Sequence, residues 1–366
     1  MEILGLEKDE LTAELAALGQ PAFRAGQILD WIYAKRAPRF DAMSNLPAAL
    51  RGSLESRFVL RPLSLVRSTG SKDTTQKFLF ALPDGQMIET VLIPASPALY
   101  GEVSDRLTAC VSSQVGCAYG CRFCASGLDG WKRHLSAAEI VSQILSVEEI
   151  SGQKINNIVF MGMGEPFANY DNLLKAIRIL NAPWGVGLGA RHMTVSTSGL
   201  APRIRDFADQ PLQIRLAISL HGATNEVRST IMPVNKRFPV EELIEACTYF
   251  STRKKQYLTF EYILIRDIND SPEQASALAR LANGLRAKIN LIPYNTVEGL
   301  TWERPDRPTQ EAFLKILLDR GIAATLRREK GHDIAAACGQ LRLQTSRDQG
   351  TDTAGKKLFA LGPGAE

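Results

Sequence analysis

Three closely spaced cysteines, Cys117, Cys121 and Cys124, constrain this chain more than any other feature of its sequence. Their C-x3-C-x2-C spacing places three thiols on one loop, and thiolate sulfur selects iron–sulfur, zinc or copper(I) centres over hard ions. Each thiolate can bind a different iron of a [4Fe–4S] cluster, which leaves the fourth iron without a protein ligand. That iron can chelate S-adenosylmethionine, and an electron from the cluster can then cleave a C–S bond to give a 5′-deoxyadenosyl radical.

Zinc is the alternative metal for these thiols. Structural zinc sites usually take four ligands in paired Cys-x2-Cys or Cys/His sets. No second pair follows Cys124, and His134 is ten residues further along the chain. We therefore expect an iron–sulfur cluster at the cysteine loop.

Length and composition are those of an ordinary globular protein. The chain has 366 residues, of which 45% are hydrophobic and 22% charged, enough for one large and one smaller domain. Its first ten residues are acidic, which argues against a signal peptide, and no segment reaches the roughly 20 apolar residues that span a bilayer. We expect a cytoplasmic protein with no membrane partner. In that compartment its six cysteines serve as ligands or catalysts rather than as structural disulfides.

The first part of the chain has the apolar spacing of helices. Helices are predicted at 7–18, at 22–34 and after Pro47, and strands at 75–82 and 86–93 are joined by the turn residues Pro83-Asp84-Gly85. This pattern predicts four parts: an N-terminal helical domain at 1–65, a hairpin linker at 66–100, a main domain at 101–343 and a flexible tail at 344–366.

Positive charge gathers in the predicted helical domain. Residues 21–61 carry seven Lys and Arg against three acids, a local net charge of +4. Such a cluster favours a polyanionic partner such as RNA, and a solvated helical face explains it equally well.

Strand-like and helix-like segments alternate from Leu107 onward. Strands are predicted at 108–113, 156–161, 192–197, 213–220, 257–265 and 287–293, and helices at 136–150, 170–181, 201–208, 240–252, 272–284 and 309–320. The first of these helices opens with the capping-box spacing of Ser136 and Glu139. Six such units predict an α/β fold with parallel strands and outer helices. Because the cysteine loop follows the first strand, an incomplete (β/α)6 barrel is favoured over an open doubly wound sheet.

Short polar segments end several of these strands. Residues 163–166 end the second strand, 196–199 the third, 219–221 the fourth and 293–295 the sixth. Each alone is ordinary turn chemistry, and His221 alone would more often be a core or loop histidine. Because ligands gather at the carboxyl ends of barrel strands, these segments are expected to line one pocket for an amino acid, a ribose and an adenine.

Longer stretches of the sequence carry a family resemblance. They are residues 110–117 (CVSSQVGC), 161–166 (MGMGEP), 216–221 (LAISLH), 289–295 (INLIPYN) and 333–341 (DIAAACGQL). Together these segments resemble the RlmN/Cfr family of radical-SAM RNA methyl synthases, over about residues 4–341, and Phe123 before the third cysteine fits the same motif. Residues 23–31 (FRAGQILDW) are more similar to the RlmN members than to the shorter-armed Cfr members.

The resemblance implies a role for each matching residue. Cys117, Cys121 and Cys124 would hold the [4Fe–4S] cluster. The positions that would bind S-adenosylmethionine are Gly164, Glu165, Ser196, Ser219, Leu220, His221 and Asn295. Cys338 would be the cysteine that is methylated and then bonded to the RNA base, Cys110 its resolving partner and Glu89 the proton acceptor. Two segments, 125–127 and 330–333, depart from the usual family pattern.

The implied activity is formation of 2-methyladenosine. The substrates would be 23S rRNA near the peptidyl transferase centre and certain tRNAs, at the adenine 3′ to the anticodon. One S-adenosylmethionine would methylate Cys338, whose thiolate nearby cations such as Lys330 would activate, and a second would supply the radical. A disulfide between Cys110 and Cys338 would release the product. An electron donor such as flavodoxin or ferredoxin and a monomeric state are also expected.

Two other activities stay open, and four residues have plainer explanations. A radical-SAM enzyme with a different product, including C8 methylation of the same base, is the first alternative. A non-enzymatic iron–sulfur or zinc protein that binds RNA is the second. From the residues alone, Cys110 is also explained as a buried core thiol beside a strand, and Cys338 as a small residue near a helix start. On the same basis, Glu89 is expected to face solvent on a strand edge, and Cys247 is expected to be a core residue on an apolar helical face.

Overall fold

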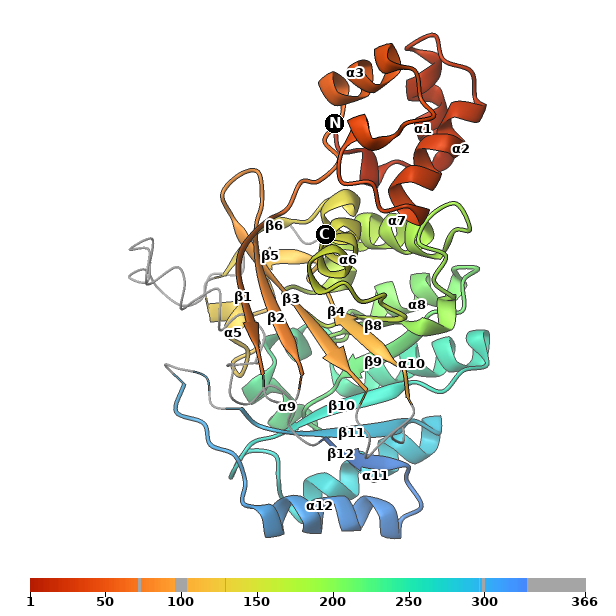
Figure 1. The fold of residues 1–366 in the computed structure, drawn as a ribbon. Helices are drawn as coiled ribbons and strands as arrows, with labels where there is room; N and C mark the ends of the chain where they lie inside the picture. The colour runs from red at the N-terminus through yellow and green to blue at the C-terminus, as the bar shows by residue number, and fades with distance from the viewer. Residues whose placement is uncertain (72–73, 96–103, 129, 296, 298–299, 328–366) are drawn as a thin grey trace.

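Apolar strands and capped helices beyond Leu107 build a parallel sheet, and an antiparallel hairpin extends it at one edge (Figure 1). The computed structural model describes residues 1–71, 74–95, 104–128, 130–295, 297 and 300–327. Cys338 and the predicted flexible tail lie outside these residues.

The strands are β1 (Ser64–Gly70), β2 (Gln76–Ala81), β3 (Met87–Pro94), β4 (Leu107–Cys110), β5 (Gln114–Gly116), β6 (Trp131–His134), β7 (Asn157–Phe160), β8 (Met193–Thr197), β9 (Arg215–Ser219), β10 (Thr259–Leu264), β11 (Lys288–Pro293) and β12 (Ala324–Leu326). The helices are α1 (Lys8–Ala16), α2 (Phe23–Leu29), α3 (Ala48–Arg57), α5 (Ala125–Leu128), α6 (Ala137–Ser151), α7 (Tyr170–Asn181), α8 (Ala201–Asp209), α9 (Asn225–Ile231), α10 (Val240–Lys254), α11 (Pro272–Leu285) and α12 (Arg307–Asp319).

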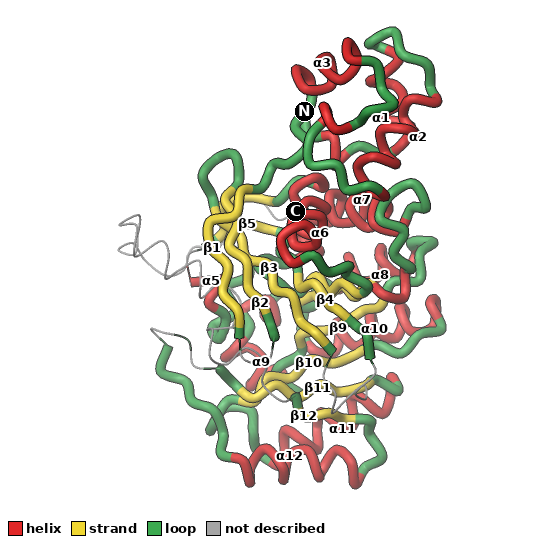
Figure 2. The backbone as a smooth tube through the Cα atoms, in the orientation of Figure 1, coloured by secondary structure: helices red, strands yellow, loops and turns green. Residues whose placement is uncertain are grey.

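Within the described residues, ten strands form one sheet in the order β1-β2-β3-β4-β7-β8-β9-β10-β11-β12. Strands β1 to β4 pair antiparallel, and β4 to β12 pair parallel along the rest of the sheet. Figure 2 shows this curved sheet with α6, α7, α8 and α10 on one side of the strands. The predicted α/β class and its six strand–helix units are confirmed.

The strand register divides the sheet into a helix-covered face and an inner face. Directly paired residues point to the same face, and alternate residues of a strand share it. Thr90 of β3 points to the helices, because its hydroxyl donates to the Gln143 side chain of α6 at 2.9 Å. Glu89 therefore points to the inner face, together with Cys110 of β4. The same register places Ser196, Ser219 and Glu261 on the inner face, so this side of the sheet is polar.

Helix α6 begins as its sequence predicts. The Ser136 hydroxyl accepts from the Glu139 backbone N–H at 3.1 Å, and the Glu139 carboxylate accepts from the Ser136 N–H at 2.9 Å. This reciprocal capping satisfies two backbone donors that would otherwise have no partner in the helix. The cap places α6 directly after the β5–β6 ribbon.

Several elements were not predicted. They include β1, the two-stranded β5–β6 ribbon that flanks the cysteine loop, the short helices α5 and α9, the edge strand β12, and the π-helical turn Asp30–Ala34 that follows α2. Most are short, so their pattern of apolar residues is too brief to stand out from that of a loop. Strand β1 is longer, but most of its residues are exposed and it lacks an apolar alternation. The predicted hairpin forms, and it joins the main sheet through pairing of β3 with β4.

The N-terminal helices α1 to α3 pack against the end of the main body formed by α6 and α7 (Figure 1). Among the described residues, four ion pairs cross this contact: Arg36 with Glu148 at 2.6 Å, Lys175 with Glu10 at 2.7 Å, Arg178 with Glu7 at 2.7 Å, and Arg61 with Glu149 at 3.4 Å. Glu148 is buried, so the first pair is less screened by water than the other three. In the part of the chain that the structure describes, no helix is both long and apolar enough to cross a membrane.

Replacement of Gln143 by Leu should loosen the attachment of α6 to the sheet. The fully buried Gln143 amide accepts from the Ser112 N–H at 2.8 Å and donates to the Ser112 carbonyl at 2.9 Å, besides its bond to Thr90. Leu would leave these buried groups unpaired, at a cost of about 3–5 kcal/mol in the free energy of unfolding. Urea unfolding measures this loss, and Gln153→Leu, at an exposed position, serves as the control. A loss below about 1 kcal/mol would contradict the assignment.

Candidate functional site

The cysteine loop is held between the β5–β6 ribbon and the ends of the parallel strands. Gly116 has a φ of +73°, and a Cβ there would lie 1.8 Å from the Gly130 carbonyl oxygen, so only glycine allows this close turn. The Arg122 N–H donates to the Ile231 carbonyl at 2.9 Å. The Phe123 ring meets the His221 ring edge to face, with centroids 4.7 Å apart. The loop is thus fixed to α9 and to the end of β9.

The three cysteines are partly exposed, and their thiols lie close enough to repel one another as thiolates. Burial, with a smaller effect of the neighbouring Cys124, raises the pKa of Cys117 to about 12. Burial, together with Cys117 and Cys124, also raises the pKa of Cys121 well above its usual value. Thiolates form readily in such a place only when a cation binds them. Three soft donors on one loop match the needs of a [4Fe–4S] cluster, which takes each sulfur on a different iron.

A site for a single metal ion would need at least three ligand side chains that converge on one point. Among the residues that the structure describes, no three His, Cys, Asp or Glu side chains converge so as to hold one ion.

Glu165 lies beside the cysteine loop at the end of β7. Its carboxylate accepts from the Phe167 N–H at 3.0 Å and from the Ser198 N–H at 2.7 Å. Its own N–H donates to the Gln114 side chain at 2.8 Å. Burial raises the pKa of Glu165, and the two backbone donors oppose this effect. A buried carboxylate held in one orientation is suited to bind an ammonium group.

Ser196 and Ser219 bring two hydroxyl groups to the inner face. Their Oγ atoms lie 3.3 Å apart on the adjacent strands β8 and β9. Leu220 follows β9, and its N–H donates to the Glu261 carbonyl at 3.1 Å. Its side chain is fully buried, and its carbonyl accepts from Arg228 at 3.0 Å, so both backbone groups of Leu220 have partners within the protein.

His221 is a buried residue with a left-handed backbone, at φ +56°. The Ile263 N–H donates to its Nδ1 atom at 3.1 Å, and the Asn269 amide donates to its carbonyl at 2.7 Å. Burial, followed by the nearby Arg228 charge, lowers the pKa of His221 to about 3. The ring is therefore neutral at pH 7, and because Nδ1 accepts a hydrogen bond, the proton is on Nε2. His221 thus offers one N–H donor.

Asn295 lies just beyond the end of β11. Its side-chain oxygen accepts from Arg304 at 2.6 Å, while Arg304 also donates to the Tyr294 carbonyl at 2.8 Å. These bonds orient the Asn295 amide at the far end of the row of strand ends. The predicted binding residues Gly164, Glu165, Ser196, Ser219, Leu220, His221 and Asn295 thus occupy the ends of β7, β8, β9 and β11.

Glu89 does not lie on a solvent-facing strand edge, and that expectation was wrong. It is 2% exposed on β3, which lies inside the sheet between β2 and β4. The Lys77 ammonium lies 3.0 Å from its carboxylate, and both side chains are buried. Register places Glu89 two residues from Val91, which pairs with Cys110. Glu89 and Cys110 therefore share the inner face.

Cys247 is fully buried on α10, as predicted.

Four further polar residues surround the site and were not singled out from the sequence. Lys77 and Gln114 are fully buried. Glu261 accepts from the Asn290 amide at 2.6 Å on the inner face beside Ser219, and burial raises its pKa. Arg228 is fully buried on α9. Polar residues at inward positions of predicted strands could have suggested Lys77 and Glu261, while nothing local distinguishes Arg228 from an exposed helix residue.

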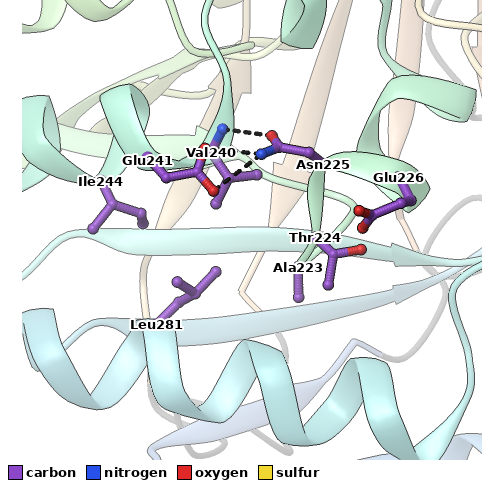
Figure 3. Close-up of a pocket in the computed structure, with 8 residues that line it drawn as sticks. All are labelled: Ala223, Thr224, Asn225, Glu226, Val240, Glu241, Ile244 and Leu281. Carbon is purple, nitrogen blue, oxygen red and sulfur yellow. Dashed lines mark hydrogen bonds between the residues drawn. The ribbon is translucent and has the colours of Figure 1, made fainter.

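The pocket drawn in Figure 3 is a separate feature. It has a volume of about 370 Å³ and is lined from α9, α10 and α11 by residues such as Asn225, Glu241 and Leu281. The Asn225 amide donates to the Glu241 carboxylate at 2.8 Å. None of the predicted site residues lines this pocket.

Comparisons with known proteins agree with this arrangement. The family model described as "Radical SAM superfamily" matches residues 111–279, and the model described as "Ribosomal RNA large subunit methyltransferase N-terminal domain" matches residues 1–60. A protein of Akkermansia muciniphila named "Probable dual-specificity RNA methyltransferase RlmN" is 54% identical, over 94% of this chain and 96% of that protein. One with the same name from Geobacillus kaustophilus is 47% identical, over 95% of this chain and 94% of that protein. The crystal structure of a radical SAM methyltransferase from Sphaerobacter thermophilus has a TM-score of 0.88 and 45% identity, and the match covers 93% of this chain and 98% of that one.

Replacement of Gly164 by Ala should displace Glu165 and destabilise the fold. Gly164 has a φ of +99°, and a Cβ there would lie 2.5 Å from the Gln114 Cβ. Backbone strain and this clash should together cost roughly 2–5 kcal/mol, and binding of S-adenosylmethionine should weaken at least about tenfold. Urea unfolding and titration calorimetry measure the two effects. Gly187→Ala, at φ +73° with open space, is the matched control for backbone strain alone. Equal losses in the two variants would contradict a role for the Gly164–Gln114 contact.

Proposed function

Because the chain belongs to the RlmN family of radical-SAM RNA methyltransferases, we propose that it converts adenosine in RNA to 2-methyladenosine. The observation that best supports this proposal is the position of the cysteine loop, against Glu165 and against the polar ends of β8 and β9. One end of the parallel sheet thus combines three thiols with groups that suit an amino acid and a nucleoside.

Cys117, Cys121 and Cys124 would hold a [4Fe–4S] cluster. When bound, the cluster supplies the electron that cleaves S-adenosylmethionine into methionine and a 5′-deoxyadenosyl radical. The buried carboxylate of Glu165 would bind the ammonium group of S-adenosylmethionine, since its two backbone donors already fix its orientation. The methionine part of S-adenosylmethionine would then lie next to the cysteine loop.

The other strand ends would bind the nucleoside half of S-adenosylmethionine. The paired hydroxyl groups of Ser196 and Ser219 can donate to and accept from ribose hydroxyls. The Nε2–H of neutral His221 and the Asn295 amide supply further polar contacts. A neutral imidazole is suited to this place, because a second positive charge would repel the sulfonium of the ligand.

Three further residues would carry the methyl group to the base. Adenine C2 is electron-poor and a poor nucleophile, so a direct attack by this carbon on a sulfonium methyl fails. Cys338, outside the described residues, would instead take a methyl group from one S-adenosylmethionine, and a second would generate the radical that activates it. After the carbon–carbon bond forms, the adduct would lose its unpaired electron to the oxidised cluster, and Glu89, whose carboxylate the nearby Lys77 holds in place, would accept the C2 proton. Attack of the Cys110 thiolate on the Cys338 sulfur would form a disulfide and break the bond from that sulfur to the transferred carbon, which would take up a proton as the methylated RNA leaves.

We propose 23S rRNA and certain tRNAs as substrates, in line with the name "dual-specificity RNA methyltransferase" carried by the relatives. The N-terminal helical domain, residues 1–65, with a net charge of +4 over residues 21–61, would contact the RNA backbone. The target base must leave its stack to reach the inner face of the sheet. A cytoplasmic monomer reduced by flavodoxin or ferredoxin completes the proposal, with residues 66–100 as the linker and 101–343 as the catalytic domain.

Anaerobic reconstitution followed by nucleoside analysis tests the proposed activity. Protein loaded with iron and sulfide should convert adenosine in 23S rRNA and tRNA to 2-methyladenosine, detected by mass spectrometry after RNA digestion. Cys121→Ala should lose both the cluster and the product, because each thiolate binds a different iron. Cys247→Ala, which removes a buried thiol far from the loop in sequence, should keep both. A product methylated at C8 would overturn the C2 assignment, and a full iron content in Cys121→Ala would overturn the cluster ligands.

Cys338 and Cys110 would act at different steps of the reaction. Cys338→Ala should prevent methyl transfer to the protein, so that no RNA adduct forms. Cys110→Ala should allow methylation of Cys338 and its addition to the base, yet fail to release the RNA, because the resolving thiolate is absent. Intact-protein mass spectrometry after nuclease treatment should therefore show a covalent nucleotide on Cys110→Ala only. Normal turnover by Cys110→Ala, or an adduct on Cys338→Ala, would refute this division of roles.

A further inference from the structure

Arg228 is a fully buried cation that forms no ion pair with a carboxylate among the described residues. It lies on α9 and is among the largest side chains with no exposed surface. Its guanidinium donates to the Leu220 carbonyl at 3.0 Å, to the Asn235 side chain at 2.8 Å and to the Ser198 carbonyl. These acceptors are neutral. They satisfy the hydrogen bonds of the guanidinium and leave its positive charge unbalanced.

An unbalanced buried charge is costly, since burial without a counter-charge carries a penalty of several kcal/mol. Such a group persists when a ligand or a partner supplies the opposite charge. The position of Arg228 therefore points to an anion that binds nearby.

The surroundings of Arg228 identify where this anion would lie. Ile231, on the next turn of α9, accepts a hydrogen bond from the Arg122 backbone of the cysteine loop at 2.9 Å. Leu220, which accepts from Arg228, precedes His221, whose ring contacts Phe123 of the same loop. Two short connections, one through Ile231 of α9 and one through Leu220 and His221, thus link Arg228 to the cysteine loop.

Two neighbouring acids do not neutralise Arg228. Burial raises the pKa of Cys247 to about 12, so this thiol is uncharged at pH 7. The carboxylate of Glu165 is joined to Arg228 only through Ser198, which donates its N–H to Glu165 and offers its carbonyl to Arg228. In the proposed function, the charge of Glu165 is used by the ammonium of S-adenosylmethionine.

We propose that Arg228 is a positioning residue whose charge balances the negative charge of the iron–sulfur centre held by Cys117, Cys121 and Cys124. This inference rests on the proposed function. Three thiolates outweigh the positive charge of the cluster core, so the bound centre is anionic, and one-electron reduction adds a further negative charge. A cation fixed nearby in a dry interior favours both retention of the centre and its reduction. The electron comes from the reduced donor protein or, in the test, from dithionite.

Redox titration of the loaded protein, followed by electron paramagnetic resonance, tests the charge of Arg228 directly. Arg228→Gln removes the charge and keeps part of the hydrogen bonding. It should lower the equilibrium constant for one-electron reduction at least tenfold, which is a shift of about 59 mV to more negative potential. Arg228→Lys keeps the charge and should shift the constant less than about threefold. Arg203→Gln, at an exposed position on α8, should leave the potential unchanged. An unshifted potential in Arg228→Gln would overturn the inference.

A thermal unfolding cycle separates this electrostatic role from a purely structural one. Loss of the three hydrogen bonds alone would destabilise the cluster-free and cluster-loaded proteins equally. Removal of an unbalanced charge should instead harm the cluster-free protein less, so the gain in Tm on loading should be smaller in Arg228→Gln than in wild type. Equal gains would contradict the inference.

Failure of the Arg228 inference can be distinguished from failure of the proposed function. If Arg228→Gln does not fold, the potential of Arg228→Lys decides, because a large shift despite the retained charge would refute the proposal and a wild-type value would support it. If wild-type protein itself takes up no cluster, the proposed function is refuted, and Arg228 would then need another anion as its partner.

Discussion

Gln114 joins the cysteine loop to the end of β7, and most of the site depends on this joint. It is fully buried, its N–H donates to the Met163 carbonyl at 3.2 Å, and its side-chain oxygen accepts from the Glu165 N–H at 2.8 Å. Its side-chain nitrogen lies 3.0 Å from Nδ1 of His134 on β6. One residue thereby fixes the β5–β6 ribbon, the Glu165 turn and the loop between them. The joint exists only because residue 164 has no Cβ, so the glycine and the glutamine form one structural unit.

The regular part of the fold could be predicted because each parallel strand is short, apolar and followed by a helix with a readable start. The predicted strand at 192–197 is observed as β8, Met193–Thr197, and the predicted helix at 170–181 is observed as α7, Tyr170–Asn181. Strand ends in a parallel sheet meet at one edge, which is why Ser196 lies 3.3 Å from Ser219 and the Ser198 N–H donates to Glu165. What could not be predicted were elements whose existence depends on a partner, such as β5 and β6, which pair across the cysteine loop.

The sequence also did not predict which strands pair with one another in the sheet. From the sequence alone, Glu89 is expected to be a solvent-facing carboxylate, because only the pairing of β3 with both β2 and β4 shows that the strand is not at an edge of the sheet. The Lys77–Glu89 ion pair follows from this pairing, since a buried carboxylate requires a compensating group. Arg228 shows the same limit more strongly. Its sequence neighbours are those of an exposed helix, and only the packing of α9 against the ends of β8 and β9 buries it.

Burial shifts the pKa values of Cys117, Glu165 and His221 in the sense that favours the neutral form of each group. It raises the first two pKa values and lowers the third, as expected where water is excluded. For His221 the sign is clear: a folded-state pKa near 3, below the unfolded value of 6.5, stabilises the fold above pH 6.5 and loses this contribution as the pH falls toward 3. Arg228 is the exception, because a guanidinium stays charged at pH 7 even when burial lowers its pKa to about 10. The buried Lys77 charge is balanced by Glu89, whereas Arg228 has no carboxylate partner among the described residues, so the site is prepared for a ligand that brings negative charge with it.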